Sequence, residues 1–402
     1  MDTSDPDPAA SSGPTLSGSA TAEADPVAPV PVVPHYGGAC LSSVVPALLG
    51  RRGAGDDWVP EPVRHARQVV LVALDGLGWE KLQSASGMVP TLASMTGGPI
   101  TSVAPTTTAT ALTSLATGST PAQHGVVGYR LRLDPSDDEA RAAGEIMNVL
   151  RWRSDRGDLR RRVPAPRFQP VAPFAGRSVA VVTRNEFAAT GFSAAHLAGT
   201  RLVGWSVPST LVVETRRLLR EGEAFVYVYY DGLDKVAHEH GLGEHYAEEL
   251  RTVDRLVADL LDALVPGSAL VITSDHGQVE VGPSARLPDP GLFEGVELFS
   301  GEGRFRWLHV RPGARDDVVA AATEAHGAEA WVRTRDDIED AGWFGGRLAP
   351  HVAARLGDVA LVAHAPVAFL DPADTGETRL LARHGSLTSA EMWVPLVAWG
   401  RS

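Results

Sequence analysis

Three apolar runs in this chain each lead into an aspartate, and this repeated pattern constrains the fold more than any other feature. The runs are Gln68–Leu74, Ala224–Tyr230 and Ala269–Thr273, and the aspartates that follow them are Asp75, Asp231 and Asp275. Short runs rich in Val, Ile and aromatic residues predict β-strands, and nearly continuous apolar sequence predicts strands that are covered on both faces. Ligands of open α/β sheets bind at the carboxyl ends of the strands, so we expect these acidic residues to meet in one crevice.

A fourth apolar run, Ser178–Thr183, and several helical patterns alternate with these strands. The expected helices are Thr108–Ala116, Pro208–Arg220, Gly243–Leu264 and Asp316–Glu324, with a first helical segment over Cys40–Leu49. Strands that alternate with helices are typical of α/β proteins. We therefore predict a three-layer α/β/α sandwich with a mostly parallel central sheet and a smaller inserted cap region.

The composition of the chain changes near residue 34 and again after residue 282. Residues 1–34 contain seven prolines, five acidic residues and no basic residue, which predicts a disordered acidic tail. We expect one folded domain over residues 35–402, with the cap or insert around 283–374. Within the insert, the run Val359–Leu370 predicts a further strand.

The charge of the chain and its single cysteine exclude several classes of protein. The 402 residues carry 36 basic and 49 acidic side chains, a net charge of −13 with neutral histidines. This argues against a protein that binds nucleic-acid polymers, because neutralising phosphates requires clustered Lys and Arg. Cys40 is the only cysteine, which excludes an intramolecular disulfide and a Cys-rich metal site.

No run approaches the roughly 18 apolar residues of a membrane span, and the acidic N-terminus is unlike a signal peptide, so we expect a cytoplasmic protein.

Aspartate and histidine recur together after the predicted strands. Asp234 and His238 are spaced so that one helical turn places both on the same face, and Asp275 is directly followed by His276 and the turn-forming Gly277. Carboxylate oxygen and imidazole nitrogen together are the ligands expected for zinc or a similar divalent ion. Two such ions about 3.5–4 Å apart would suit phosphoryl transfer, because they stabilise both the attacking and the leaving oxygen.

A threonine-rich segment over Pro105–Gly118 predicts a loop that enters a helix near Thr108. The N-terminus of a helix offers unpaired N–H groups and a positive dipole end, which favour an alkoxide and an incoming phosphate oxygen. A hydroxyl is a poor nucleophile at neutral pH unless a base or a metal ion lowers its pKa, so a nucleophilic threonine here needs the ions. A helix-capping hydroxyl is the alternative interpretation.

Taken together, these motifs resemble the alkaline phosphatase superfamily, and most of all its type I nucleotide pyrophosphatase/phosphodiesterase branch. In chain order they are LVALDGLG, PTTTATALTSLATGSTPAQHGVVGY, YYDGLDKVAHEHG and VITSDHGQ, followed by ARHGS with His384. The resemblance extends from Val69 to Trp399 and is only vague in the cap. It implies an alkaline phosphatase-like catalytic domain over residues 35–402.

The resemblance also implies how the site is assembled. The implied ligands form two groups, Asp234, His238 and His384 for one ion and Asp75, Asp275 and His276 for the other. The nucleophilic threonine would bridge the two ions. Pro105, Thr108 and Gly118 fit the spacing of the family, so we assign this role to Thr108 and leave Thr106 and Thr107 in the loop. Zinc is the expected ion, and manganese or iron is the alternative.

One departure from the family concerns the contacts to the substrate. The branch usually has an asparagine three residues after the nucleophile, and this chain has Ala111 there, which removes one donor to a phosphoryl oxygen. The backbone N–H of Ala109 and the side chains of Asn148 and Arg151 are candidates to take its place. A solvated loop is the alternative interpretation for Asn148 and Arg151.

The remaining histidines near these motifs have no predicted chemistry. His124 belongs to the Pro-x-x-His-Gly element of the second motif, where we expect it to pack near the site. His196, His240 and His245 have no motif support, and we expect exposed or hydrogen-bonded surface residues.

The resemblance implies a metal-dependent hydrolase that cleaves phosphodiester or pyrophosphate bonds through a covalent phosphothreonine. The expected partner is a small phosphate-ester or nucleotide-like substrate, and the sequence indicates no oligomeric state. A phosphomonoesterase or phosphonate hydrolase on the same two-metal site is the first alternative. A metal-binding relative without turnover, suggested by Ala111, is the second.

Overall fold

The computed structural model of the chain describes residues 29–50, 56–134, 144–374 and 376–401. The chain divides into two units, Met1–Val30 and Pro31–Ser402, and the fold described below is that of the second. Residues 1–28 of the predicted acidic tail lie outside the described residues. Among the described residues, no helix combines the length and the apolar character that crossing a membrane requires.

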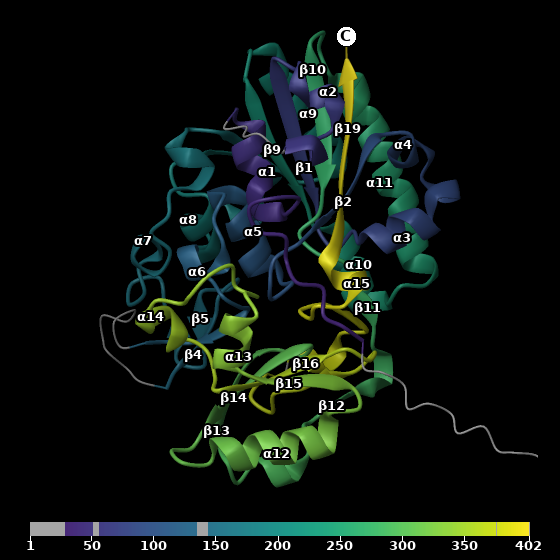
Figure 1. The fold of residues 1–402 in the computed structure, drawn as a ribbon. Helices are drawn as coiled ribbons and strands as arrows, with labels where there is room; N and C mark the ends of the chain where they lie inside the picture. Colours follow the sequence, from purple (N-terminus) through teal and green to yellow (C-terminus); the bar gives the residue numbers. More distant parts are fainter. Residues whose placement is uncertain (1–28, 51–55, 135–143, 375, 402) are drawn as a thin grey trace, which may run out of the picture. The chain divides into compact units, whose positions relative to one another are not determined.

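A seven-stranded sheet forms the centre of this unit (Figure 1). In sheet order the strands are β2 (Thr96–Thr101), β19 (Trp393–Arg401), β10 (Ser268–Thr273), β1 (Gln68–Leu74), β9 (Phe225–Tyr230), β7 (Ala180–Arg184) and β8 (Arg201–Trp205). The strands from β10 to β8 are all parallel, whereas β19 runs antiparallel to both of its neighbours. The prediction of a mostly parallel central sheet is therefore confirmed.

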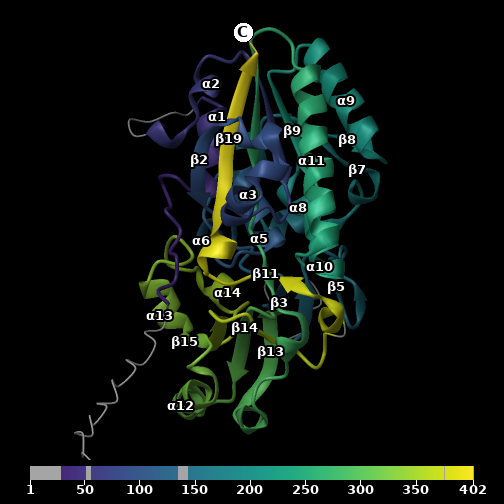
Figure 2. The same cartoon turned by 90° about the vertical axis from the view of Figure 1, so that its right-hand side faces the viewer.

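Helices cover both faces of this sheet, because its central strands are apolar on both sides. Leu71 and Ala73 of β1 pack into one core cluster, and Val70 and Val72 pack into another. The first face carries α1 (Leu41–Leu48), α5 (Thr108–Thr117) and α8 (Gly191–His196), with the shorter α2 (Glu61–Arg64), α6 (Pro121–His124) and α7 (Ala165–Phe168) nearby. The second face carries α3 (Trp79–Ser84), α4 (Pro90–Ala93), α9 (Pro208–Arg220), α10 (Gly232–His240) and α11 (Glu244–Ala263). Figure 2 shows α9 and α11 side by side on this face.

Three strands of the main sheet, β2, β8 and β19, were not predicted. The sequence of β2 is TGGPIT, and Gly and Pro are both disfavoured in strands. Pro99 of β2 lies opposite Pro395 of β19, so the two residues that cannot donate a hydrogen bond face each other in the ladder. The position of β2 at the sheet edge is the one at which proline is tolerated.

A second, antiparallel sheet lies within the insert expected around 283–374, below the main sheet in Figure 1. Its strands in order are β13 (Val296–Glu302), β14 (Phe305–Val310), β16 (Val359–Ala363) and β15 (Ala330–Thr334). Helix α12 (Arg315–His326) packs on this sheet, and α13 (Arg335–Asp340) and α14 (Pro350–Ala353) complete the helices of the insert. The single strand predicted over Val359–Leu370 is wrong, because the chain turns at Pro366 between β16 and β17 (Ala368–Phe369).

Short strands and one short helix connect these parts around the site. Two pairs are β11 (Val279–Glu280) with β18 (Ala382–Arg383), and β12 (Ala285–Arg286) with β17. A small antiparallel sheet consists of β3 (Arg130–Arg132), β4 (Ile146–Asn148), β5 (Arg153–Ser154) and β6 (Gly157–Asp158). Helix α15 (Ser389–Met392) precedes β19.

Buried ion pairs fasten the second sheet to the rest of the unit. The guanidinium of Arg304 donates to both carboxylate oxygens of Glu391 in α15, at 2.7 and 2.8 Å, and both side chains are fully buried. Arg306 of β14 donates from Nη2 to one carboxylate oxygen of Glu377, and both of these side chains are buried as well. Removing one partner of such a pair leaves an uncompensated buried charge, which costs more than the pair itself contributes.

We expect Glu391→Ala to lower the free energy of unfolding by about 3–5 kcal/mol, because it leaves Arg304 charged and buried. Chemical denaturation measures the loss. The control is Asp340→Ala, which breaks an exposed pair with Arg347 and should cost less than about 1 kcal/mol. Equal effects of the two substitutions would contradict the structural role given to the buried pair.

Candidate active site

The predicted ligands come from separate segments that meet at the carboxyl edge of the main sheet. Asp75 follows β1, Asp275 and His276 follow β10, and Asp234 and His238 lie on α10, which follows β9. His384 follows β18. The strands β1, β9 and β10 are adjacent and parallel, so their ends place these side chains together.

The ligand atoms form two groups of three within the part of the chain that the structure describes. The groups are Asp234, His238 and His384, and Asp75, Asp275 and His276, and within each group the ligand atoms all lie within 4.8 Å of one another. The rings of His276 and His384 stack with their centroids 3.5 Å apart, which makes the two groups neighbours. These are the two sets that the resemblance implied.

Thr108 lies beside both groups as the first residue of α5. Its Oγ1 is 3.2 Å from Nε2 of His276, and that nitrogen is 3.5 Å from Asp75 and 3.4 Å from Asp275. Thr108 is 8% exposed, so the hydroxyl is held at the floor of the crevice rather than in bulk solvent. The first N–H groups of the helix have no acceptor within the helix and point toward this end.

The three histidines are all oriented by carbonyl groups. Nδ1 of His238 lies 2.7 Å from the carbonyl of Ala382, and Nδ1 of His384 lies 2.8 Å from that of Thr106. Nδ1 of His276 lies 3.1 Å from the carbonyl of Gly277. A carbonyl only accepts, so each Nδ1 carries the proton and each Nε2 is left with a free lone pair, as a metal ligand requires.

The charges of the site fit divalent cations. Oδ1 of Asp75 and Oδ2 of Asp275 are buried and have no hydrogen-bond partner among the described residues. Burial raises the pKa of Asp75, and the nearby charges of Asp275 and Asp234 raise it further. Burial likewise raises the pKa of Asp234 and lowers that of His384. Bound cations would relieve the repulsion between these carboxylates and satisfy the two orphaned oxygens.

The structure also places the residues proposed to contact substrate. Asn148 donates from its side-chain amide to the hydroxyl of Tyr129 at 2.6 Å and accepts the backbone N–H of Arg151 at 3.0 Å. Thr108, Asn148 and Arg151 border one cavity of about 290 Å³. Ala109 is the second residue of α5 and is fully buried.

Ala111 is fully buried in the core cluster between α5 and the main sheet. The sequence analysis expected the family's donor to be missing at this position, and the residue there is an alanine packed in the core. Its apolar side chain is suited to the core.

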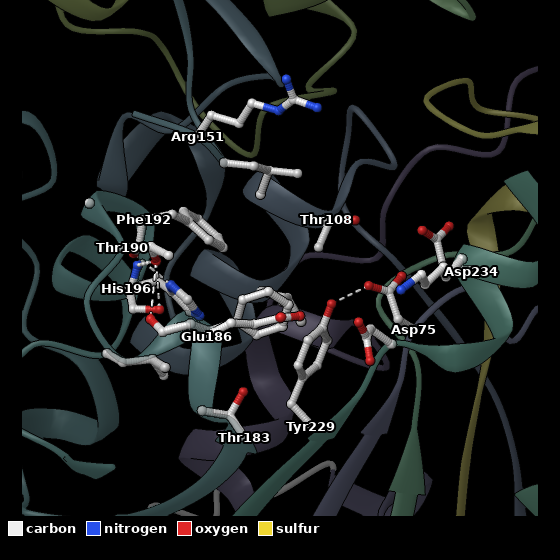
Figure 3. Close-up of a pocket in the computed structure, with 18 of the residues that line it drawn as sticks. Asp75, Thr108, Arg151, Thr183, Glu186, Thr190, Phe192, His196, Tyr229 and Asp234 are labelled. Atoms are coloured by element: carbon white, nitrogen blue, oxygen red, sulfur yellow. Dashed lines mark hydrogen bonds between the residues drawn. The ribbon is translucent and has the colours of Figure 1, made fainter. Parts of the chain in front are cut away.

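A larger cavity of about 1080 Å³ is also bordered by Thr108 (Figure 3). Its polar end contains Asp75, Asp234 and Thr108, and its apolar wall includes Leu112, Leu150, Val181, Phe187, Phe192 and Leu197. Tyr229 stands between the two parts and donates to Asp75 from its hydroxyl. Arg151 extends over Thr108 at the opposite rim.

The expectation of a surface position is wrong for His196. The residue is 5% exposed on α8, its ring stacks on Phe192, and Nδ1 lies 2.8 Å from the carbonyl of Phe192. Burial lowers its pKa to about 4, so it lines the large cavity as a neutral imidazole.

His240 and His245 are exposed and stack on each other. His124 is buried against Ser114, at 2.8 Å, and burial lowers its pKa to about 3.

Three residues of the site were missed in the sequence. Tyr229 is the first residue of the motif YYDGLDKVAHEHG, but it reads there as part of an apolar strand, and Glu302 lies outside every motif at the end of β13. Arg383 precedes His384 directly, and that adjacency was the one available signal. All three lie on the walls of the two cavities because strands far apart in sequence end there.

Comparison with known proteins agrees with this geometry. The family model described as type I phosphodiesterase/nucleotide pyrophosphatase matches residues 69–387. No curated protein sequence matches the chain. Murine ectonucleotide pyrophosphatase/phosphodiesterase 5 is similar in structure, with a TM-score of 0.61 at 17% identity over 83% of this chain and 88% of that one. A structure of an inactive variant of the murine protein in complex with AMP also matches, with a TM-score of 0.61 at 16% identity over 84% and 88% of the two chains.

A bacterial enzyme is similar as well. Phosphonoacetate hydrolase from Sinorhizobium meliloti in complex with phosphonoacetate gives a TM-score of 0.60 at 20% identity, over 83% of this chain and 90% of that one. At these identities the likeness establishes the shared fold.

We expect zinc to raise the melting temperature more at about pH 8 than at about pH 5.5. The pKa values of Asp75 and Asp234 are raised, so in the metal-free protein these carboxyls keep their protons to higher pH, and zinc must displace them. Burial lowers the pKa of His384, which favours the neutral form that can bind a metal ion. Differential scanning fluorimetry with and without zinc measures this increase in melting temperature at each pH.

Two matched variants test the assignment. Asp75→Asn should remove most of the zinc-induced increase in melting temperature, whereas Asp340→Asn, on the exposed surface, should retain it. A zinc increment that is independent of pH, or that survives in the Asp75 variant, would contradict the assignment of these carboxylates.

Proposed function

Because the chain belongs to the type I phosphodiesterase/nucleotide pyrophosphatase family, a family of phosphoric ester hydrolases, we propose that it cleaves phosphodiester or pyrophosphate bonds in small organic phosphates, nucleotide-like ones included. The observation that carries the proposal is the meeting of two Asp/His groups and one helix-terminal hydroxyl at the edge of the sheet. In this proposal residues 35–402 are the catalytic domain and the region around 283–374 is its cap.

Two divalent ions, with zinc as the first choice, are part of the proposal. Asp234, His238 and His384 would hold one, and Asp75, Asp275 and His276 would hold the other. When bound, such ions would lower the pKa of a hydroxyl or water and offset the charge of the phosphoryl oxygens.

Thr108 is the proposed nucleophile. The N-terminus of α5 favours negative charge on its oxygen, and burial keeps competing water away from it. Attack by Oγ1 forms the bond to phosphorus while the bond to the leaving oxygen breaks, which gives a phosphothreonine and an alcohol or phosphate. Water then cleaves the phosphothreonine and restores the hydroxyl.

Charge on the phosphoryl oxygens must be met by donors that are already in place. The backbone N–H of Ala109 at the helix terminus, the amide of Asn148 and the guanidinium of Arg151 are the proposed donors. Asn148 is held by Tyr129 and by the N–H of Arg151, so its position does not have to be established during the reaction.

The size of the large cavity favours a substrate with a bulky organic group. A cavity of about 1080 Å³ with an apolar wall exceeds what a phosphate group alone needs. A diester or pyrophosphate supplies such a group together with a second one. The likeness to phosphonoacetate hydrolase supports phosphonate hydrolysis on the same site as the second candidate.

We expect Thr108→Ala to lower kcat by at least about 1,000-fold while both ions stay bound, because their six other ligands are unchanged. Steady-state kinetics and metal analysis of the same preparation test this. Thr110→Ala, a buried hydroxyl on the same helix without a hydrogen-bond partner, is the control and should retain activity. A fully active Thr108 variant would reject the nucleophile, and an inactive wild type that binds both ions would favour a metal-binding relative without turnover.

We expect the zinc- or manganese-loaded enzyme to prefer bis-p-nitrophenyl phosphate to p-nitrophenyl phosphate by about tenfold or more in kcat/KM. The second aryl group adds contact with a cavity wall, which the monoester cannot provide. The same chromophore is released from both substrates, so the rates are directly comparable. A preference for the monoester would instead support the phosphomonoesterase alternative.

A further inference from the structure

The wall of the small cavity beside Thr108 contains a buried cation whose guanidinium makes no direct ion pair with a described carboxylate. Arg383 lies on β18, is 3% exposed and borders this cavity together with Thr108 and His384. Its Nη2 donates to the carbonyl of Glu377, whereas its Nε has no hydrogen-bond partner among the described residues. The charges of Glu377 and Asp374 act on the guanidinium, but the side-chain contacts of those carboxylates are to Arg306 and Arg130. A buried charge that is not paired is costly, so its persistence next to a reaction centre points to a ligand.

The neighbouring arginines show that the fold otherwise satisfies such groups. Every guanidinium nitrogen of Arg304 has an acceptor, and the side chain pairs with Glu391. Every guanidinium nitrogen of Arg306 likewise has an acceptor, and the side chain pairs with Glu377. Glu377 is thus already paired, and Arg383 is the member of this buried set that is left without a carboxylate.

The carboxyl of Glu302 also borders the small cavity and does not neutralise Arg383. One of its oxygens accepts the backbone N–H of Tyr129 at 3.2 Å, and the other has no hydrogen-bond partner in the part of the chain that the structure describes. Burial raises the pKa of Glu302 to about 8, so near neutral pH the group is mostly protonated and can donate a hydrogen bond.

The backbone leaves room at the guanidinium. Gly303 borders the cavity, and a Cβ at that position would lie 3.2 Å from Nη1 of Arg383. The absence of a side chain there lets a ligand oxygen approach the guanidinium.

The two cavities share Thr108, Leu150, Arg151, Asp234, His238 and Leu380. A phosphorus atom at Thr108 therefore borders both cavities and has space for one group in each. The large cavity has an extended apolar wall and suits a bulky group, whereas the small one is bordered mostly by residues with polar or charged side chains and has room for a compact group.

We propose that Arg383 and the small cavity form a subsite for an anionic second arm of the substrate. The preferred substrate then carries a bulky organic arm and a compact charged arm on the reacting phosphorus, as in a phosphoanhydride. This inference rests on the proposed hydrolytic function and adds the chemical class of the second arm. Attack by Thr108 would break the bridging P–O bond, and the terminal phosphate would leave with the bonding electrons while the threonine proton passes to solvent.

The test compares two substrates that share one arm, adenosine 5′-diphosphate and the p-nitrophenyl ester of adenosine 5′-monophosphate. We expect Arg383→Met to lower kcat/KM for the diphosphate by about tenfold to 100-fold, the effect of losing a hydrogen bond to a charged group, and to leave the ester within about twofold. Arg383→Lys should retain part of the preference for the diphosphate over the ester, because it keeps the positive charge. Arg333→Met, the same change on the exposed face of β15, should alter neither rate.

The outcomes separate the subsite from the proposed function. A wild type that cleaves neither substrate rejects the proposed function, whereas one that cleaves the ester but not the diphosphate rejects only the subsite. Equal losses on both substrates in Arg383→Met would assign the arginine a structural role and also overturn the subsite. Phosphonoacetate serves as a third substrate. If Arg383→Met lowers kcat/KM for phosphonoacetate alone, the anionic arm is a carboxylate.

A second variant keeps the test decisive if Arg383→Met does not fold. Gly303→Ala retains the charge and every ligand but narrows the cavity beside Nη1, and its backbone is not in the left-handed region. We expect it to lower the ratio of diphosphate to ester turnover. An unchanged ratio in this variant would overturn the subsite.

Discussion

The repulsion between aspartates that are buried together at one edge of the sheet is the constraint on which the rest of the site depends. Asp75 and Asp275 end adjacent parallel strands, and each has a carboxylate oxygen that no group in the described chain satisfies. Such an arrangement is costly unless cations or protons compensate it. The carbonyl-oriented histidines and the terminus of α5 lie around these carboxylates in positions that suit bound cations and a nucleophilic oxygen.

Much of this arrangement could be predicted because it depends on local patterns. Continuous apolar runs predicted β1, β9 and β10 within a residue of their bounds, and the parallel geometry of adjacent strands then brought their terminal residues together. Strand β2 was missed because its Gly and Pro residues oppose a strand in isolation, and only pairing with β19 makes it one. Tertiary context therefore decides the elements whose propensity is weak.

The walls of the two cavities could not be predicted for the same reason. His196 has no motif, and it became buried because α8 packs beside α5 and the main sheet. In the sequence, Arg383 is only the residue before the predicted ligand His384. That it makes no direct ion pair becomes clear in the structure, where Arg304 pairs with Glu391 and Arg306 with Glu377. The cavity walls thus depend on packing between distant segments, whereas the proposed metal ligands lie in short motifs that can be recognised in the sequence.

Two divalent ions are proposed to bind at these two groups of side chains. Anomalous X-ray diffraction from crystals of the zinc-loaded protein would locate them. We expect two zinc peaks, one among Asp234, His238 and His384 and the other among Asp75, Asp275 and His276, both next to Thr108. Zinc bound elsewhere, or absent from both groups at saturating concentration, would contradict the proposal.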